Sequence, residues 1–295
     1  MNPPSPRIEP LHWPELTAQQ LHADVLRLDQ LHPVVSGNKW FKLHRHLQLA
    51  ANHSTILTFG GAWSNHLVAT AYAAREAGFQ TIGMVRGERP SAFTDTLQEA
   101  AGYGMRLEFL TRGQYADKEQ PVFLQQLANR FPGVYIIPEG GGGIPGITGS
   151  ETILSKINAA DYTHVLCAIG TGTTCLGLVR ASLPGQQIIG IPILKGFSSI
   201  DPTGLLTGEQ TNRTHLLQGY DFGGYAKHPQ ALLDFMNRLY TDSGIPTDIV
   251  YTGKVFYAAH DSIRRHLFPA RSRLLIIHSG GLQGNRSLRP GQLLF

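Results

Sequence analysis

The class of fold is decided by one stretch in the first half of the chain, Thr55-Ile56-Leu57-Thr58-Phe59-Gly60-Gly61-Ala62-Trp63-Ser64. Its first five residues are apolar or β-branched and predict a buried strand, after which two glycines turn the chain. Apolar residues then recur at helical spacing, so a helix is predicted from about Ser64 to Gly78.

The same alternation continues outward from this stretch. We predict strands at 80–86, 106–110 and 134–137 and helices at 94–103 and 121–130. Parallel neighbouring strands need a crossover helix, so the alternation predicts an α/β fold with a parallel sheet covered on both faces. The glycine run 140–146 is interpreted as a mobile or close-approach loop, with a domain crossing just after it.

A second α/β series fills the rest of the chain. It comprises predicted helices at 148–159, 175–183 and 230–240 and strands at 164–169, 187–193 and 273–277. Residues 1–35 are predicted to be an irregular lead-in with a short strand at 25–28. We therefore predict two α/β domains, a small one at 52–147 and a large one assembled from 1–51 and 148–295.

Composition limits the possible partners. The 295 residues carry a formal charge of +4 without basic runs, which argues against nucleic acid. No signal peptide opens the chain and no apolar run reaches membrane-spanning length, so we expect a cytoplasmic protein with no membrane partner. Two cysteines and scattered histidines predict no metal site. His44 and His46 are expected on the surface.

Two lysines lie at a predicted helix start in Ser36-Gly37-Asn38-Lys39-Trp40-Phe41-Lys42-Leu43. An amine held still near a carbonyl group can form an imine, and Lys39 follows a Gly-Asn turn that would hold it. Lys39 and Lys42 are three residues apart and share one helix face, where they could present two cations to one anion. The alternative is an ordinary surface helix with two solvated lysines.

A candidate anion site lies between a predicted strand and helix, in Gly170-Thr171-Gly172-Thr173-Thr174. Backbone N–H groups and hydroxyls converge there at the positive end of the helix dipole. The run lacks the Gly-Lys-Ser/Thr of a nucleotide P-loop and the third glycine of a dinucleotide fingerprint. A tight turn needed only for packing is the alternative.

Ser64-Asn65-His66 begins a helix at the carboxyl end of a strand, where open α/β sheets place ligands. Its N–H groups could bind a substrate carboxylate, and the Ser64 hydroxyl could relay a proton; helix capping by Ser64 is the alternative. No Gly-x-Ser-x-Gly elbow of a serine hydrolase surrounds it. Tyr251, beside an expected Gly-Lys turn, and Tyr225 are each more typical of packed aromatic residues when taken alone.

Together these motifs resemble the pyridoxal-phosphate enzymes of the tryptophan synthase β-like fold (fold type II). Within that fold, the chain resembles the 1-aminocyclopropane-1-carboxylate deaminase/D-cysteine desulfhydrase family. The matching motifs fall in family order from residue 36 to residue 281: Gly37-Asn38-Lys39 with Lys42, Gly60-Gly61 with Ser64-Asn65-His66, the loop 170–174, Tyr251-Thr252-Gly253-Lys254, and His278-Ser279-Gly280-Gly281.

The resemblance implies roles for these residues. Lys39 would bind the aldehyde of pyridoxal 5'-phosphate as an imine and later take the α-proton of the substrate. Ser64, with the N–H groups of Asn65 and His66, would receive the substrate carboxylate, and Tyr251 and Tyr225 would be catalytic. The cofactor would be held by Lys42, Asn65, Gly170, Thr171, Gly172, Thr173, Thr174 and Thr252.

The implied activity is a lyase or deaminase acting on a small amino acid and releasing ammonia and an α-keto acid. Thr252 stands where the cyclopropane deaminases have glutamate, which favours D-cysteine desulfhydrase-like chemistry. Trp63 stands where the family usually has glutamine, and Leu67-Val68 stand where it commonly has arginine. These departures imply a pocket that is smaller or more apolar than is usual in the family, and so a different substrate is an open alternative. A homodimer is implied. The alternatives are a non-catalytic cofactor- or metabolite-binding homologue and, third, a serine hydrolase.

Overall fold

The computed structural model describes residues 5–197, 199–201 and 204–295, so residues 1–4 of the opening segment lie outside the described part. Packing divides the chain into two compact units. The small unit is continuous and spans 39–149, whereas the large unit combines the residues up to 38 with 150–295. Each unit has its own sheet, so the predicted α/β class is confirmed.

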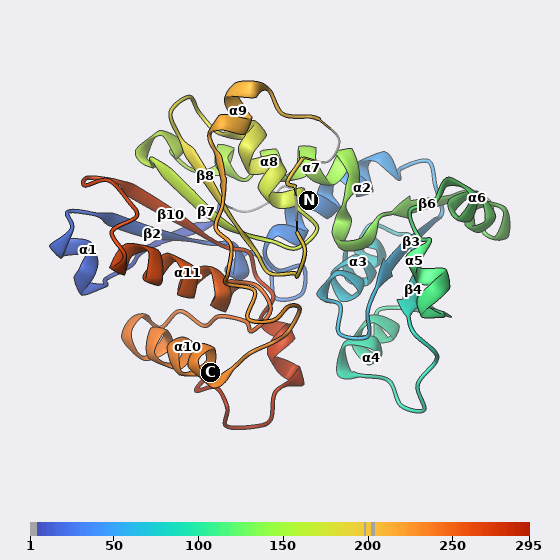
Figure 1. Ribbon diagram of the computed structural model, residues 1–295. Coiled ribbons are helices and arrows are strands. Elements are labelled where there is room, and N and C mark those ends of the chain that lie inside the picture. The colour runs from blue at the N-terminus through green and yellow to red at the C-terminus, as the bar shows by residue number, and fades with distance from the viewer. Residues whose placement is uncertain (1–4, 198, 202–203) are drawn as a thin grey trace. The chain divides into compact units, whose positions relative to one another are not determined.

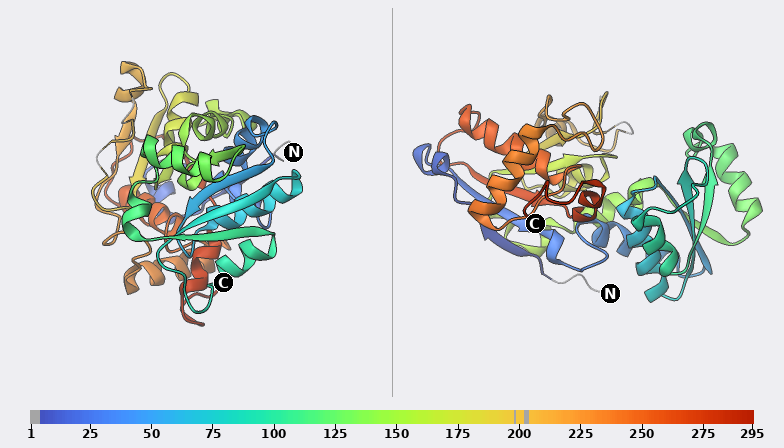
Figure 2. Two further views of the ribbon diagram at one scale, coloured as in Figure 1. Left: turned by 90° about the vertical axis from the view of Figure 1, so that its right-hand side faces the viewer. Right: turned by 90° about the horizontal axis from the view of Figure 1, so that it is seen from below.

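The small unit contains a four-stranded parallel sheet in the order β5-β4-β3-β6. Its strands are β3 (Thr55–Gly60), β4 (Gln80–Arg86), β5 (Met105–Leu110) and β6 (Val134–Ile137). Its helices are α2 (Asn38–Leu49), α3 (Asn65–Glu76), α4 (Asp95–Gly102), α5 (Arg112–Ala116) and α6 (Pro121–Arg130). Figure 2 shows α3 and α4 on one face of this sheet and α6 on the other, as right-handed crossovers require.

The large unit contains a six-stranded sheet in the order β1-β2-β10-β7-β8-β9. Only β1 is antiparallel to its neighbour. The strands are β1 (Arg7–Pro10), β2 (His22–Arg27), β7 (His164–Ile169), β8 (Gln187–Pro192), β9 (Thr214–Leu216) and β10 (Arg273–His278). The helices are α1 (Pro14–Ala18), α8 (Thr173–Ala181), α9 (Gly208–Asn212), α10 (Gln230–Ser243) and α11 (Thr252–Arg264). In Figure 1, α8 and α9 cover one face, and α10 and α11 the other.

Several predictions of secondary structure were wrong. The glycine run 140–146, predicted as a mobile or close-approach loop, is a 3-10 turn at Glu139–Gly141 that leads into helix α7 (Gly143–Glu151). Close approach is found at Gly141, where a Cβ would lie 3.2 Å from Lys42 Cβ. Helix α7 ends at Glu151, and only short 3-10 turns follow where a helix at 148–159 was predicted. Helix α11 replaces the expected turn after Tyr251. The lead-in also contains more regular structure than predicted, namely β1 and α1.

The boundary of the small unit differs from the predicted 52–147, because helix α2 packs with residues of that unit. Lys42 Nζ donates to Gly140 O at 3.3 Å, and His46 Nε2 lies 2.9 Å from Gly142 O. Gly149 lies so close to Phe41 that an added Cβ would come within 2.2 Å of its carbonyl oxygen. Helix α2 and the glycine turn therefore form one packed region.

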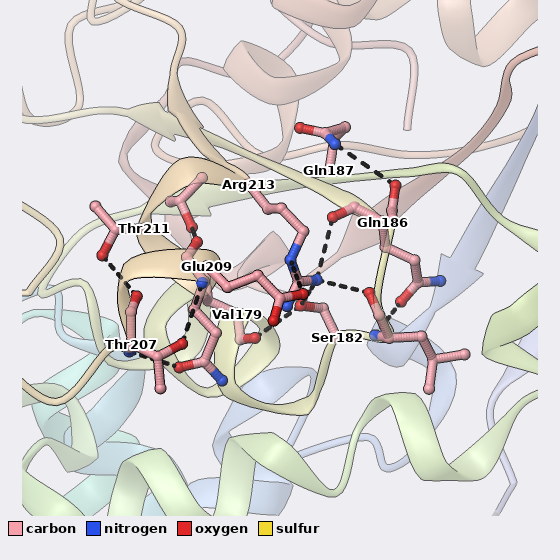
Figure 3. A network of polar contacts seen from close by, with 12 residues as sticks. Val179, Ser182, Gln186, Gln187, Thr207, Glu209, Thr211 and Arg213 are labelled. Atoms are coloured by element: carbon pink, nitrogen blue, oxygen red, sulfur yellow. Dashed lines mark hydrogen bonds and ion pairs between the residues drawn. The ribbon is translucent and has the colours of Figure 1, made fainter.

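A polar network fixes α9 and β9 to the connection between α8 and β8 (Figure 3). Arg213 donates to Ser182 Oγ at 3.0 Å and to Leu183 O at 2.6 Å, and it forms an ion pair with Glu209. The contacts of Arg213 stay within these segments, so we assign the network a structural role. No helix in the described part of the chain is long and apolar enough to cross a membrane.

Candidate active site

The turn before Lys39 is fixed by the backbone of the large unit. Gly37 has a φ of +70°, and a Cβ there would lie 1.8 Å from Ser279 O, so only glycine fits. Asn38 N donates to Ser279 O at 3.1 Å, and Asn38 Nδ2 donates to Thr174 Oγ1 at 2.7 Å. The half-buried Lys39 therefore follows a residue that is bonded to the predicted anion loop.

Lys42 is a buried amine, with 3% of its surface exposed. Its Nζ donates to Gly140 O, and no ion pair joins it to an acidic side chain among the described residues. Burial, and then the positive charge of Lys39, hold the pKa of Lys42 well below its ordinary value. An anionic ligand beside this amine would supply the missing countercharge, so the residues favour a phosphate or carboxylate in the small unit.

His66 has a structural side chain. Thr58 donates its hydroxyl hydrogen to Ile137 O at 2.9 Å, so His66 Nε2, 2.7 Å from the same hydroxyl, must be the donor in that contact. Burial, followed by the charges of Lys39, Lys42 and His46, holds the pKa of His66 well below its ordinary value. The ring is therefore neutral and occupied, which is compatible with the prediction that His66 would meet a carboxylate through its backbone N–H and not through its ring.

His46 is not on the surface as predicted, because only 1% of it is exposed. Gly142 O can only accept, so His46 Nε2 donates to it and Nδ1 accepts from Tyr135 Oη at 3.1 Å. Burial lowers the pKa of His46 to about 4. No local pattern reveals this burial, because its partners Tyr135 and Gly142 are distant along the chain.

Ser64 stands at the N-cap of α3, but its side chain makes no capping hydrogen bond. The capping alternative is therefore not realised, and the hydroxyl is left for another partner. The turn before it is held instead by Thr94, whose hydroxyl donates to Ala62 O. Trp63 lies on this turn with 38% of its surface exposed, and Asn65, half-buried, opens the helix.

The loop 170–174 leads into helix α8, at the place where an anion site was predicted. Gly172 adopts a left-handed φ of +83° as N-cap of the nine-residue helix α8, and the Thr171 and Thr173 hydroxyls lie 3.1 Å apart. Thr173 and Thr174 are buried at the positive end of the helix. Gly170 lies against Tyr251, because a Cβ there would be 3.2 Å from Cε1 of the ring. The structure thus brings the loop and Tyr251 together.

Asp248 organises the segment that carries Tyr251 and Thr252, and the sequence analysis missed it. This fully buried carboxylate accepts from the backbone N–H groups of Val250, Tyr251 and Thr252 at 2.8–2.9 Å. Burial raises the pKa of Asp248, and these hydrogen bonds oppose the rise. Its side chain thereby caps α11, and the signal in the sequence is an aspartate four residues before the helix.

The hydroxyl of Thr252 adds two hydrogen bonds to Asp248. Its hydroxyl donates to Asp248 Oδ1 at 2.6 Å and accepts from Asp248 N at 2.8 Å. The single hydroxyl hydrogen is therefore committed, and the oxygen retains one lone pair. Toward a ring nitrogen, Thr252 could act only as an uncharged acceptor.

Tyr225 lies on the exposed turn 221–226 of the large unit, with half of its surface exposed. Below this turn, Lys254 Nζ donates to Asp221 O at 2.8 Å and to Gly224 O at 2.7 Å. Lys254 is completely buried on the first turn of α11, three residues after Tyr251. One buried amine therefore joins the segments that carry the two predicted catalytic tyrosines.

Parallel α/β sheets, a lysine-bearing helix start and a glycine-threonine turn at a helix N-terminus define a class of enzymes that handle small anionic ligands. The chain belongs to the family of pyridoxal-phosphate dependent enzymes, whose family model matches residues 7–280. The predicted membership and cofactor are confirmed.

Similar proteins agree with this assignment. A putative 1-aminocyclopropane-1-carboxylate deaminase of Pyrococcus horikoshii is 27% identical over 95% of this chain and 93% of its own length. A D-cysteine desulfhydrase of Salmonella typhi is 26% identical over 87% of this chain and 86% of its own length. The crystal structure of an ACC deaminase homologue superposes with a TM-score of 0.79 at 25% identity, covering 96% of this chain and 91% of that one.

The residues fit pyridoxal phosphate. The cofactor carries an aldehyde for an amine and a phosphate for an anion site, and when bound it supplies an electron-withdrawing ring. Lys39 offers the amine, and buried Lys42 lacks an acidic partner among the described residues. Gly172 opens helix α8 with buried hydroxyls beside it, as a phosphate site requires.

Proposed function

We propose that the protein is a lyase or deaminase that converts a small amino acid to an α-keto acid and ammonia, in the manner of a D-cysteine desulfhydrase or a 1-aminocyclopropane-1-carboxylate deaminase. Relatives with these two names span most of the chain, which supports the proposal. The observation that carries it is the hydrogen bond from the Thr252 hydroxyl to buried Asp248. Thr252 directly follows Tyr251.

The proposed roles follow the chemistry of each group. Lys39 would hold the cofactor through its aldehyde, and its amine would be the base that takes the α-proton of the substrate. The Ser64 hydroxyl and the N–H groups of Asn65 and His66 hold the substrate carboxylate. Tyr251 and Tyr225 donate protons to the substrate or accept protons from it. The cofactor is held by Lys42, Asn65, Thr252 and the loop residues Gly170, Thr171, Gly172, Thr173 and Thr174.

Thr252 favours elimination over opening of an unactivated ring. A hydroxyl oxygen bears no formal charge, so it stabilises a protonated ring nitrogen less than a carboxylate would. The hydrogen of that hydroxyl is directed to Asp248, which leaves one lone pair for the ring. Weaker withdrawal of electrons suits loss of a good β-leaving group, such as the thiol of cysteine, and we therefore rank the desulfhydrase first.

The test is keto acid release by the holoenzyme from D-cysteine, L-cysteine, D-serine and aminocyclopropane carboxylate. We expect turnover of at least one of them, with D-cysteine the best. Lys39→Ala is expected to lose both turnover and the cofactor's visible absorption band, whereas Lys227→Ala, on an exposed loop, keeps both. Absence of keto acid from all four substrates, with the absorption band present, contradicts the proposed reaction.

We also infer a cytoplasmic homodimer. The family resemblance supports the dimer, and the lack of basic runs in the sequence argues against a nucleic-acid partner. Light scattering of the purified holoenzyme should give twice the chain mass of 32.3 kDa. A monomer at micromolar concentration would contradict the dimer.

A further inference from the structure

The turn that carries Tyr225 has a strained backbone. Phe222 and Ala226 are not glycines, yet they adopt φ values of +52° and +54°, and Gly223 and Gly224 between them also have positive φ. Side chains disfavour this region, so such a turn persists only where its surroundings hold it.

The contacts that hold the turn come from helix α11. Lys254 Nζ donates to the carbonyl oxygens of Asp221, just before Phe222, and of Gly224, between Phe222 and Ala226. Phe222 packs perpendicular to Tyr257 of the same helix, with ring centroids 5.0 Å apart. Within the turn, Gly224 N donates to Asp221 O at 2.9 Å.

Burial of the Lys254 amine is unfavourable, so its hydrogen bonds to the turn are needed to offset that cost. It is completely buried, and burial lowers the pKa of its amine to about 8, although the charges of Asp221 and Asp248 oppose this change. A buried ammonium of this kind needs strong acceptors, and here the two turn carbonyls supply them. A methionine of similar length would fill the space without bonding either one.

We propose that Lys254 is a positioning residue that holds the Tyr225 turn against the start of helix α11, and so fixes Tyr225 relative to Tyr251. The inference rests on the proposed function for the catalytic part of its role. Tyr251 is the N-cap of α11 and Lys254 is the third residue of this helix. The first turn of α11 therefore positions Tyr251 and also carries the amine that holds the Tyr225 turn. Neither Lys254 nor its bonds need to touch substrate.

The first test is hydrogen exchange of the holoenzyme, which requires no turnover. In Lys254→Met, the amides of Gly224 and Lys227, bonded to Asp221 O and Gly224 O, should exchange about tenfold faster than in the wild type. Lys227→Met makes the same change of side chain on the exposed side of the turn and should leave the rate at Gly224 unchanged. Wild-type exchange in Lys254→Met overturns the proposal.

The second test separates positioning from general structure. We expect kcat of Lys254→Met to fall roughly tenfold to a hundredfold with KM within about twofold, since small displacements of a catalytic group act on the chemical step. In a Tyr225→Phe background the same substitution should have little further effect. Faster exchange with unchanged kcat, or full additivity with Tyr225→Phe, overturns the positioning role.

Two further outcomes are also decisive. If Lys254→Met yields no folded holoenzyme, Lys254→Gln, a shorter neutral side chain, replaces it with the same criteria. If the wild type turns over no amino acid, the proposed function fails, and exchange at Gly224 and Lys227 alone decides whether Lys254 holds the turn.

Discussion

At the scale of single residues, Lys42 shows a conflict between stability and ligand binding. Its amine is buried beside Lys39 and has a lowered pKa, so folding disfavours its charged form. We predict that Lys42→Met raises the free energy of unfolding of the cofactor-free protein by about 1–2 kcal/mol at pH 7. The same substitution should weaken cofactor binding at least about tenfold, because a cation proposed to hold the anionic cofactor is lost.

The pH dependence follows from the sign of the shift. Between the lowered pKa of Lys42 and the ordinary value of 10.5, the unfolded chain binds more protons than the folded one. The free energy of unfolding therefore rises with pH through that window, and Lys42→Met should show a smaller rise. Urea unfolding at pH 7 and pH 9 measures both effects, with exposed Lys227→Met as control. A Lys42→Met protein that is less stable at pH 7 contradicts this account.

Single residues also show where sequence reasoning stops. The positions of Lys39 and Ser64 relative to predicted helix starts follow from local patterns. The environment of His46 does not, because its partners Tyr135 and Gly142 lie 89 and 96 residues away. Burial of a polar ring depends on such long-range bonds, which local spacing does not encode.

At the scale of elements, strand β4 was predicted to the residue because a buried run ends at exposed Gln80 and Arg86. Helix α11 was missed because its cap is the side chain of Asp248, four residues upstream, whereas Tyr251 and Gly253 are typical of a turn. Helix α7 was misplaced because glycines predict loops, yet here close packing requires them.

Helix α7 tests that explanation. Gly149 has no room for a Cβ, which would lie 2.2 Å from the backbone oxygen of Phe41. We predict that Gly149→Ala lowers the free energy of unfolding by about 1–3 kcal/mol, as overpacking does. The matched control is Gly102→Ala in helix α4, where a Cβ meets nothing within 4 Å and helix propensity should add about 0.5–1 kcal/mol. Urea denaturation of both compares them, and equal effects would contradict the packing argument.

At the scale of the whole molecule, the two units differ in how the chain builds them. In the large unit, β2 from the start of the chain lies between β1 and β10, so its sheet needs both ends of the sequence. The small unit is one continuous segment with its own sheet and core. We predicted from the sequence a small domain inserted between two segments of a large one, because the α/β alternation restarts after the glycine run. That prediction assigned the residues of α2 to the large domain.

A comparison of two fragments tests where the small unit begins. Fragment 39–149 retains α2, whose Lys42 and His46 bond the glycine turn and whose Phe41 packs on Gly149. Fragment 52–147 loses the buried surface of Trp40, Phe41 and Leu43, each side chain contributing roughly 1.5–3 kcal/mol when fully buried. We therefore predict cooperative urea unfolding, followed by circular dichroism, for 39–149 and a shallow or absent transition for 52–147. Equal midpoints would show that α2 adds nothing to this unit and would restore the boundary at residue 52.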